Sequence, residues 1–122
     1  MIRGIGTDIT EIARIQKAME NPRFAERVYT IRERESLKNL CETRMAERAA
    51  GLFCAKEAVA KAFGTGFSGF GFSDIEILED ELGKPNVYLH GNAERDGRIH
   101  VSVAHDAGLA TAFAVWEEEE NK

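Results

Sequence analysis

The spacing of apolar positions changes period within the first twenty residues. Residues 2–9 form an apolar, strand-like segment that contains Gly4 and Gly6. A glycine inside a strand often marks the close approach of another backbone or of a ligand. Helical spacing then follows, with apolar side chains at Ile9, Ile12, Ile15 and Met19. The pattern predicts a strand over 2–9 and a helix over 9–20 that Asn21-Pro22 ends.

The middle of the chain has the pattern of helices followed by a loop. Short helical turns are expected between Phe24 and Leu37, and a long helix over 45–63. The sequence Gly64-Thr65-Gly66 comes directly after that helix and is typical of a glycine cap. The segment 64–72, rich in glycine and phenylalanine, is expected to be a loop.

The remaining apolar segments are short and separated by turn residues. Residues 75–78 and 85–89 flank the turn Leu82-Gly83-Lys84 and predict one hairpin. Residues 99–103 and 109–116 predict a second. We therefore expect a single α+β domain over 1–122, in which the long helix packs on an antiparallel sheet.

Composition narrows the class of protein. The chain is 43% apolar and 30% charged, as in ordinary globular proteins. No stretch approaches the roughly 18 apolar residues that span a membrane, and the N-terminus lacks the layout of a secretory signal. Cys41 and Cys54 have no metal-type spacing and are expected to be reduced thiols, with a disulfide as the alternative. These features favour a cytoplasmic protein without membrane contact.

Charge is distributed unevenly along the chain. The net charge of −5 argues against general binding of nucleic acid, which needs a basic surface. Residues 12–34 nevertheless contain six Arg or Lys and only three Glu. Such a basic strip either docks one acidic partner or is simply a solvated face.

Glu57 and Lys61 lie one turn apart, away from the main apolar stripe of the long helix. As an exposed pair they would contribute only about 0.3–0.5 kcal/mol. Their neighbours on that side are small or apolar, which predicts a buried surface there: Ala46, Ala50, Phe53, Cys54, Ala60 and Gly64. Because Glu and Lys are seldom buried unless paired or bound, the pair is a candidate for a ligand or metal role.

Asp8 is a second candidate, with two interpretations. The sequence Asp8-Ile9-Thr10-Glu11 fits a capping box for the following helix. Alternatively, Asp8 converges with Glu57, and two carboxylates with waters suit Mg²⁺.

Two further segments allow both a functional and a structural interpretation. The backbone amides of Gly64-Thr65-Gly66 either cradle phosphate or only cap the helix. His105, beside Asp106 at the predicted hairpin tip, is either a phosphate-binding or catalytic residue or a turn residue.

Four blocks of the chain match a known family in order and spacing. They are Gly4-Ile5-Gly6-Thr7-Asp8-Ile9 with Glu11-Ile12 and Arg14-Ile15; Phe53-Cys54-Ala55-Lys56-Glu57-Ala58 with Lys61-Ala62-Phe63-Gly64-Thr65-Gly66; Leu82-Gly83-Lys84-Pro85; and His100-Val101-Ser102-Val103-Ala104-His105-Asp106. The chain resembles the bacterial holo-acyl-carrier-protein synthases, which are 4'-phosphopantetheinyl transferases of the small trimeric type. The resemblance implies the half-sized version of that fold.

The resemblance also implies roles for the site residues. Asp8 and Glu57 would bind Mg²⁺ with the pyrophosphate of coenzyme A, and Lys61 would assist the leaving group. The pocket for the coenzyme would be lined by Lys61, Gly64, Thr65, Gly66, Lys84, Pro85 and His105. In the family a carrier serine attacks the pantetheine-side phosphorus and releases adenosine 3',5'-bisphosphate. The base that deprotonates this serine stays open between a metal-bound water, Asp8 and Glu57.

The resemblance further implies an acidic apo-acyl carrier protein as partner. The family docks its carrier on the first helix, which here would present Arg14 and Lys17, with Arg23, Phe24 and Arg27 beside them. A homotrimer is implied, since half of a two-lobed fold needs a neighbour to complete its cleft. The alternatives are a non-catalytic module that binds coenzyme A or the carrier, and a metal-dependent nucleotide pyrophosphate hydrolase.

Three features depart from the family pattern. Thr10 replaces the second acid of larger relatives, which fits the small subclass, and Ala104 replaces a serine common before the histidine. The segment 90–98 is too short for the helix usual at this point, with room for about one turn.

Overall fold

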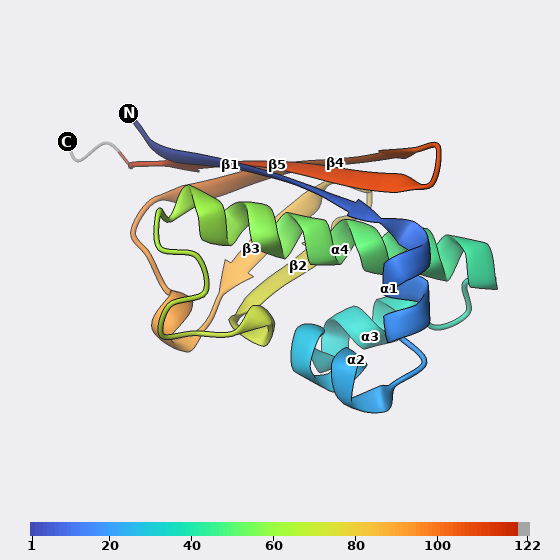
Figure 1. Cartoon of the computed structure of the whole chain (residues 1–122). Coiled ribbons are helices and arrows are strands. Elements are labelled where there is room, and N and C mark those ends of the chain that lie inside the picture. Colours follow the sequence, from blue (N-terminus) through green and yellow to red (C-terminus); the bar gives the residue numbers. More distant parts are fainter. Residues whose placement is uncertain (120–122) are drawn as a thin grey trace.

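The computed structural model describes residues 1–119 and contains a sheet with a long helix across one face. Strands β1 (Ile2–Glu11), β4 (Arg98–Asp106) and β5 (Leu109–Glu117) form an antiparallel sheet in the order β1-β5-β4. Helix α4 (Glu42–Ala62) lies under that sheet, and the hairpin of β2 (Ile75–Glu79) and β3 (Pro85–Leu89) lies beside it (Figure 1). The predicted α+β architecture is confirmed.

The alternation of side chains explains how β5 and β1 seat on α4. Every second residue of β5 is buried, from Ala110 to Trp116. In β1 the inward positions include Gly4 and Gly6, and a Cβ on either would collide with the backbone carbonyls of Ala62 and Ala58. These glycines therefore let a strand and a helix backbone approach closely, as the sequence predicted.

The start of the first helix differs from the prediction. Strand β1 continues through Glu11 because it pairs with β5 along its length, ending at Glu11 opposite Leu109. Helix α1 covers only Ile12–Ala18, so Ile9 lies in the strand and is exposed on the outer face of the sheet. Cross-strand pairing has overridden the local helical spacing.

Two short helices and two 3-10 turns complete the described part of the chain. Helix α2 (Pro22–Val28) begins with an Asn21 cap, and α3 (Ile31–Leu37) begins with a capping box of Thr30 and Glu33. Single 3-10 turns, Phe72–Asp74 and Gly91–Ala93, stand before β2 and between β3 and β4. The short segment 90–98 thus contains the one turn that its length predicts.

Two further expectations concern cysteines and membranes. Cys41 is exposed and Cys54 is buried, and neither forms a disulfide within residues 1–119. None of the helices in this described part is both long enough and apolar enough to cross a bilayer.

Candidate active site

Asp8 and Lys61 meet on the side of α4 that faces β1. Lys61 Nζ donates to Asp8 Oδ1 at 3.2 Å and to the backbone carbonyl of Thr7 at 3.0 Å. Thr10 Oγ1 donates to the other Asp8 oxygen, Oδ2, at 3.2 Å. The Asp8 carboxylate is thereby oriented from both sides, by a residue of its own strand and by a residue 53 positions away.

The capping interpretation of Asp8 is wrong. The residue that precedes α1 is Glu11, and no side chain caps that helix. Asp8 lies within β1, paired with Ala112 of β5, on the face that α4 covers. Strand β1 extends into the segment for which the apolar spacing predicted a helix, and this extension places the Asp8 carboxylate beside α4.

Glu57 lies near enough to Asp8 for the two carboxylates to influence each other, which favours the second interpretation of Asp8. Partial burial, followed by repulsion from the Asp8 carboxylate, raises the pKa of Glu57 above its ordinary value. Lys61 and Arg14 oppose this rise, so both cations are close enough to act on the same carboxylate. The arrangement is two acids that repel each other with cations at their edge.

The prediction of a fully buried pair is wrong for Lys61. Its side chain is 52% exposed, and Glu57 is only half-buried. This flank of α4 is open because β1 is the edge strand of its sheet. The small residues of α4 nearby, Ala58 and Ala62, pack against β1 and do not cover Lys61.

The glycine loop continues the same flank of α4. Glu57 and Lys61 lie one turn apart near the end of α4, and the loop begins directly after the helix ends at Ala62. Gly64 and Gly66 both have positive φ, and their amides donate to Lys61 and Ala60 carbonyls at 2.9 and 3.2 Å. The cap predicted from the sequence is confirmed.

The donor set of Asp8 and Glu57 fits Mg²⁺. Among residues 1–119 no group of three or more His, Cys, Asp or Glu side chains is arranged around a metal position. Mg²⁺ needs few protein ligands, since it keeps waters and takes oxygens from substrate phosphates. Two mutually repelling carboxylates gain from a cation between them, which is the direction that the raised Glu57 pKa indicates.

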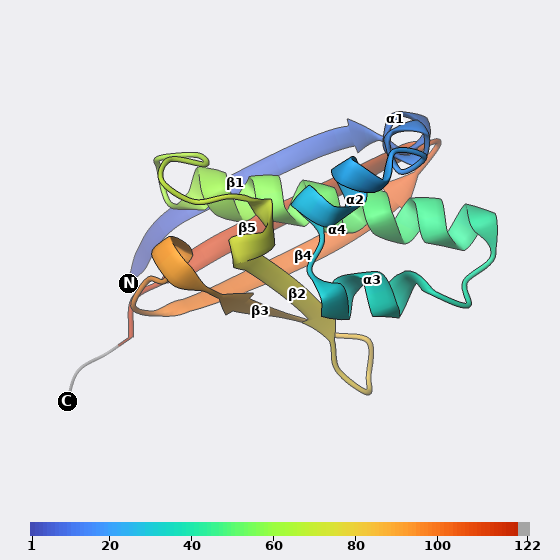
Figure 2. The same cartoon turned by 90° about the horizontal axis from the view of Figure 1, so that it is seen from below.

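Pro85 and His105 lie on the opposite flank of α4. Both line a groove of about 750 Å³ between α4, the β2–β3 hairpin and β4. His105 Nδ1 lies 3.7 Å from Glu47 Oε2 of α4, and Arg44 and Arg48 line the same groove. Figure 2 shows β1 on one side of α4 and the hairpin on the other. Within one chain, the predicted coenzyme residues are therefore divided between two flanks.

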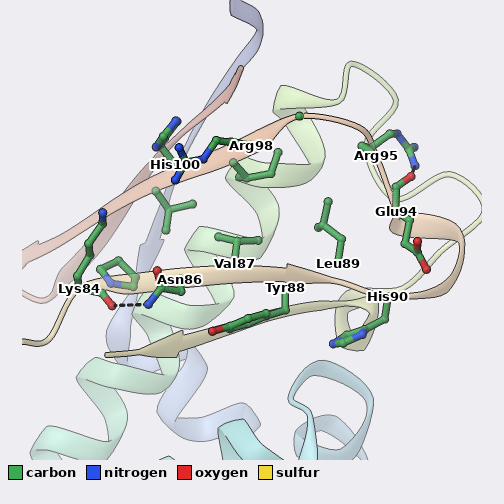
Figure 3. A pocket seen from close by; sticks show the side chains of 14 residues that line it. Lys84, Asn86, Val87, Tyr88, Leu89, His90, Glu94, Arg95, Arg98 and His100 are labelled. Atoms are coloured by element: carbon green, nitrogen blue, oxygen red, sulfur yellow. Dashed lines mark hydrogen bonds between the residues drawn. The ribbon is translucent and has the colours of Figure 1, made fainter. Parts of the chain in front are cut away.

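Lys84 lines a second hollow, of about 560 Å³, between β3 and β4. Figure 3 shows Val87 and Leu89 pointing from β3 toward β4, while Tyr88 points away. Lys84 lies at one end of this hollow, beside Pro85. The predicted Lys84-Pro85 segment thus stands where the two hollows adjoin.

The predicted docking residues share one end of the molecule, on α1 and α2. Arg14, Lys17, Arg23 and Arg27 are exposed. Phe24 is half-buried, because its ring stacks on Phe53 at 6.1 Å and packs edge-on against Tyr29 at 6.2 Å. It is thus part of the core that seats α2, with only part of its ring open to a partner.

Sequence reasoning missed three features. Thr10 orients Asp8, which the alternation of β1 would have shown had the strand been extended to Glu11. Arg44 and Arg48 join His105 in the groove. Lys56 is completely buried in an ion pair with Glu33; it lies four residues after Leu52 and three before Val59, so helical spacing beside the apolar stripe could have shown its burial.

The fold and site define a class: a small α+β protein whose edge strand and long helix bring an acid pair and a lysine to one open flank. The sequence model described as the 4'-phosphopantetheinyl transferase superfamily matches residues 4–114. Curated relatives cover nearly the whole chain. The holo-[acyl-carrier-protein] synthase of Clostridium novyi is 47% identical over 128 residues, covering 99% of this chain and 91% of its own. That of Clostridium acetobutylicum is 46% identical over 124 residues, covering 96% and 98%.

Solved structures agree. A holo-(acyl-carrier-protein) synthase from Bacillus anthracis, in complex with CoA (3',5'-ADP), is 40% identical with a TM-score of 0.88, covering 98% of this chain and 99% of that one. The synthase of Helicobacter pylori in complex with coenzyme A is 31% identical with a TM-score of 0.81, covering 93% and 99%. The chain belongs to the 4'-phosphopantetheinyl transferase superfamily.

Proposed function

We propose that this protein transfers the 4'-phosphopantetheine group of coenzyme A to a serine of apo-acyl carrier protein and releases adenosine 3',5'-bisphosphate. The observation that carries the proposal is the convergence of Asp8, Glu57 and Lys61 from β1 and α4. Relatives that span nearly the whole chain are named for this reaction, and two similar structures contain the coenzyme or its nucleotide.

The chain's own residues suit displacement at a pyrophosphate. Lys61, half-exposed beside Asp8, can place its ammonium against a phosphate oxygen and stabilise charge on the departing nucleotide. Glu57, with its raised pKa, suits the acceptance of the proton from the serine hydroxyl. Thr10 fixes the Asp8 carboxylate from behind.

Asp8 and Glu57 would together hold Mg²⁺, with waters and phosphate oxygens completing the ligands. When bound, the metal supplies charge neutralisation at the pyrophosphate. Mg²⁺ also relieves the repulsion between the two carboxylates, which is the property of this chain that favours it.

We propose that a second copy of the chain completes the coenzyme cleft, in a homotrimer. Asp8, Glu57 and Lys61 lie on one flank of α4, while Pro85 and His105 line a groove on the other. The outer face of the sheet bears exposed apolar side chains: Ile5, Ile9, Leu109 and Phe113. No described element covers that face (Figure 1), and such a patch is typical of a subunit contact.

The carrier would dock on the basic surface of α1 and α2. Arg14 acts on Glu57, so this surface is directly beside the acid pair. Acyl carrier proteins are acidic, and opposite charge steers such encounters. A cytoplasmic location is consistent with two cysteines that form no disulfide in residues 1–119.

One assay tests the function. The protein is incubated with coenzyme A, Mg²⁺ and an apo-carrier, and the mass of the carrier is followed. A gain of one phosphopantetheine, with stoichiometric release of adenosine 3',5'-bisphosphate, is the expected result. Binding without a change in mass indicates a non-catalytic module, and coenzyme cleavage without carrier indicates a hydrolase; either outcome overturns the proposal.

A further inference from the structure

Lys56 and Glu33 form an ion pair within the core. Both side chains are 0% exposed, and Lys56 Nζ lies 2.6 Å from Glu33 Oε1. Among the ion pairs of residues 1–119, this is the one in which neither side chain reaches solvent. Lys56 directly precedes Glu57 in α4 but is not part of the open flank.

The pair bonds the backbone of three further segments and of the N-cap of α3 itself. Lys56 donates to the carbonyls of Val28, the last residue of α2, at 2.7 Å, and of Phe72 at 3.1 Å. Glu33 accepts from the amide of Thr30 at 2.8 Å through Oε1 and from the amide of Ile77 at 2.7 Å through Oε2. The three donors of the ammonium are thus all used. One charged pair ties α2, α3 and β2 to α4.

Fold stability alone does not require such a pair. Burying two charges is costly, and a well-packed apolar pair of similar volume is often as stable or more stable. An apolar pair, however, has no directional bonds and could not bond the carbonyl of Val28 or the amide of Ile77. The ion pair differs from an apolar pair in fixing where α2 and α3 stand relative to α4.

The position of α2 bears on the proposed function. Helix α2 contains Arg23 and Arg27, and its Phe24 ring stacks on Phe53 of α4. The pair therefore joins the end of the docking helix to the residue before Glu57. The end of the loop 64–72 is held twice, by the bond from Lys56 to the Phe72 carbonyl and by the stacking of Phe67 on Phe72 at 4.1 Å.

We propose that the Lys56–Glu33 pair is a positioning unit that keeps α2, with Arg23 and Arg27 of the carrier-docking surface, in register with the acid pair. This inference rests on the proposed docking surface. Neither residue touches the carrier or the coenzyme; each acts through the helices that it joins.

The test compares Lys56→Met and Glu33→Gln with Lys38→Met, which removes an exposed ion pair of α3. Both pair variants are expected to raise the carrier KM by about tenfold or more, the scale of a displaced docking contact. The coenzyme KM and the kcat at saturating carrier should stay within about threefold, since neither variant changes the acid pair and the stacking of Phe67 on Phe72 still holds the loop. Amide exchange should become faster in residues 22–37 than in 42–62. Lys38→Met should match the unchanged protein.

A purely structural pair would give a different result. It would lower the melting temperature while leaving the carrier KM within about twofold of normal at a temperature where the variant is folded. That result, or equal rises in both KM values, overturns the inference. If Lys56→Met does not fold, Glu33→Gln decides by the same criteria.

Arg14→Ala is measured alongside to separate the two proposals. A raised carrier KM in Arg14→Ala, with none in the pair variants, overturns the positioning role alone. A normal carrier KM in Arg14→Ala overturns the docking surface, and the inference falls with it.

Discussion

The two flanks of α4 differ in charge and in what holds them. The β1 flank has two acids and one lysine, with Asp8 fixed by Lys61 and Thr10. The opposite flank has His105, Arg44 and Arg48 around an open groove. Glu47 and Glu79 contact His105 and Arg48 there, so part of its positive charge is paired.

This difference matches two parts of one substrate. An acid pair suits a metal and the reacting pyrophosphate, whereas cationic side chains suit phosphate groups that take no part in the reaction. The flanks lie on different sides of α4 (Figure 2), which is why the proposed function joins the flanks of two copies around one coenzyme molecule. On the proposed function, each chain would therefore offer two half-sites, and a second copy would join them.

The largest expected effect comes from neutralising the acidic flank. Asp8→Asn and Glu57→Gln should each lower kcat by about a hundred- to ten-thousand-fold. Each variant removes one of the two carboxylates that would hold Mg²⁺, and with it the positive charge that would neutralise the displaced phosphate. The measurement is transfer to the carrier under saturating coenzyme, followed by mass. Glu42→Gln, an exposed acid at the start of α4, is the control. Near-normal kcat in both variants would remove the acid pair from the reaction.

Mixing tests whether the two flanks work across copies. In Asp8→Ala chains only the flank with His105 is intact, and in His105→Ala chains only the β1 flank is intact. Coexpressed in equal amounts, they should form a complete site at about one interface in four, because each interface draws its two flanks from independent chains. We expect about a quarter of normal activity from the purified mixed assembly. Activity no greater than the mean of the two variants would place both flanks of the working site in one chain.

A smaller effect is expected where the carrier meets the acidic flank. Arg14→Ala should raise the carrier KM by about three- to tenfold and weaken its dependence on salt, since a rim charge mainly affects encounter. The coenzyme KM should change less. The measurement is initial rate at low and high ionic strength, with Lys38→Ala as control. An unchanged carrier KM at low salt would place the docking surface elsewhere.

Much of the fold follows from local pattern. The β2–β3 hairpin, the glycine cap and the one-turn segment 90–98 depend on nearby residues, and the sequence predicted each. The end of β1 does not, because pairing between Glu11 and Leu109 decides it and these residues are far apart in the chain. The same long-range pairing decides that Asp8 is a strand residue instead of a cap.

The site shows the same limit. Helical spacing put Glu57 and Lys61 together but could not show that their flank lies at a sheet edge, where Lys61 stays half-exposed. Helical spacing places Lys56 and Lys61 on different sides of α4 but does not show what each lysine binds. The two lysines differ in their partners: Lys56 pairs with Glu33 of α3, whereas Lys61 pairs with Asp8 of the edge strand β1. The division of the coenzyme residues between two flanks likewise depends on packing around α4.

The smallest expected effect concerns the stability of the acidic flank without metal. Glu57 has a raised pKa in the folded chain, so its ionised form is disfavoured there relative to the unfolded chain. The charge therefore destabilises the fold at neutral pH, and this penalty disappears as the pH falls below the ordinary Glu pKa of about 4.3. Glu57→Gln removes the charge and should raise the melting temperature by about 1–3 °C near neutral pH. The gain in melting temperature should shrink as the pH falls toward the pKa of an ordinary glutamate.

Adding Mg²⁺ sharpens this last measurement. If Asp8 and Glu57 hold the metal together, Mg²⁺ should raise the melting temperature of the unchanged protein and should raise that of Glu57→Gln less. Glu42→Gln should respond to Mg²⁺ as the unchanged protein does, since Glu42 bonds only Gln16 at the far end of the helix. An equal response of all three proteins to Mg²⁺ would show that Asp8 and Glu57 do not bind the metal. The raised pKa of Glu57 would then fit only a role in accepting the proton of the serine hydroxyl.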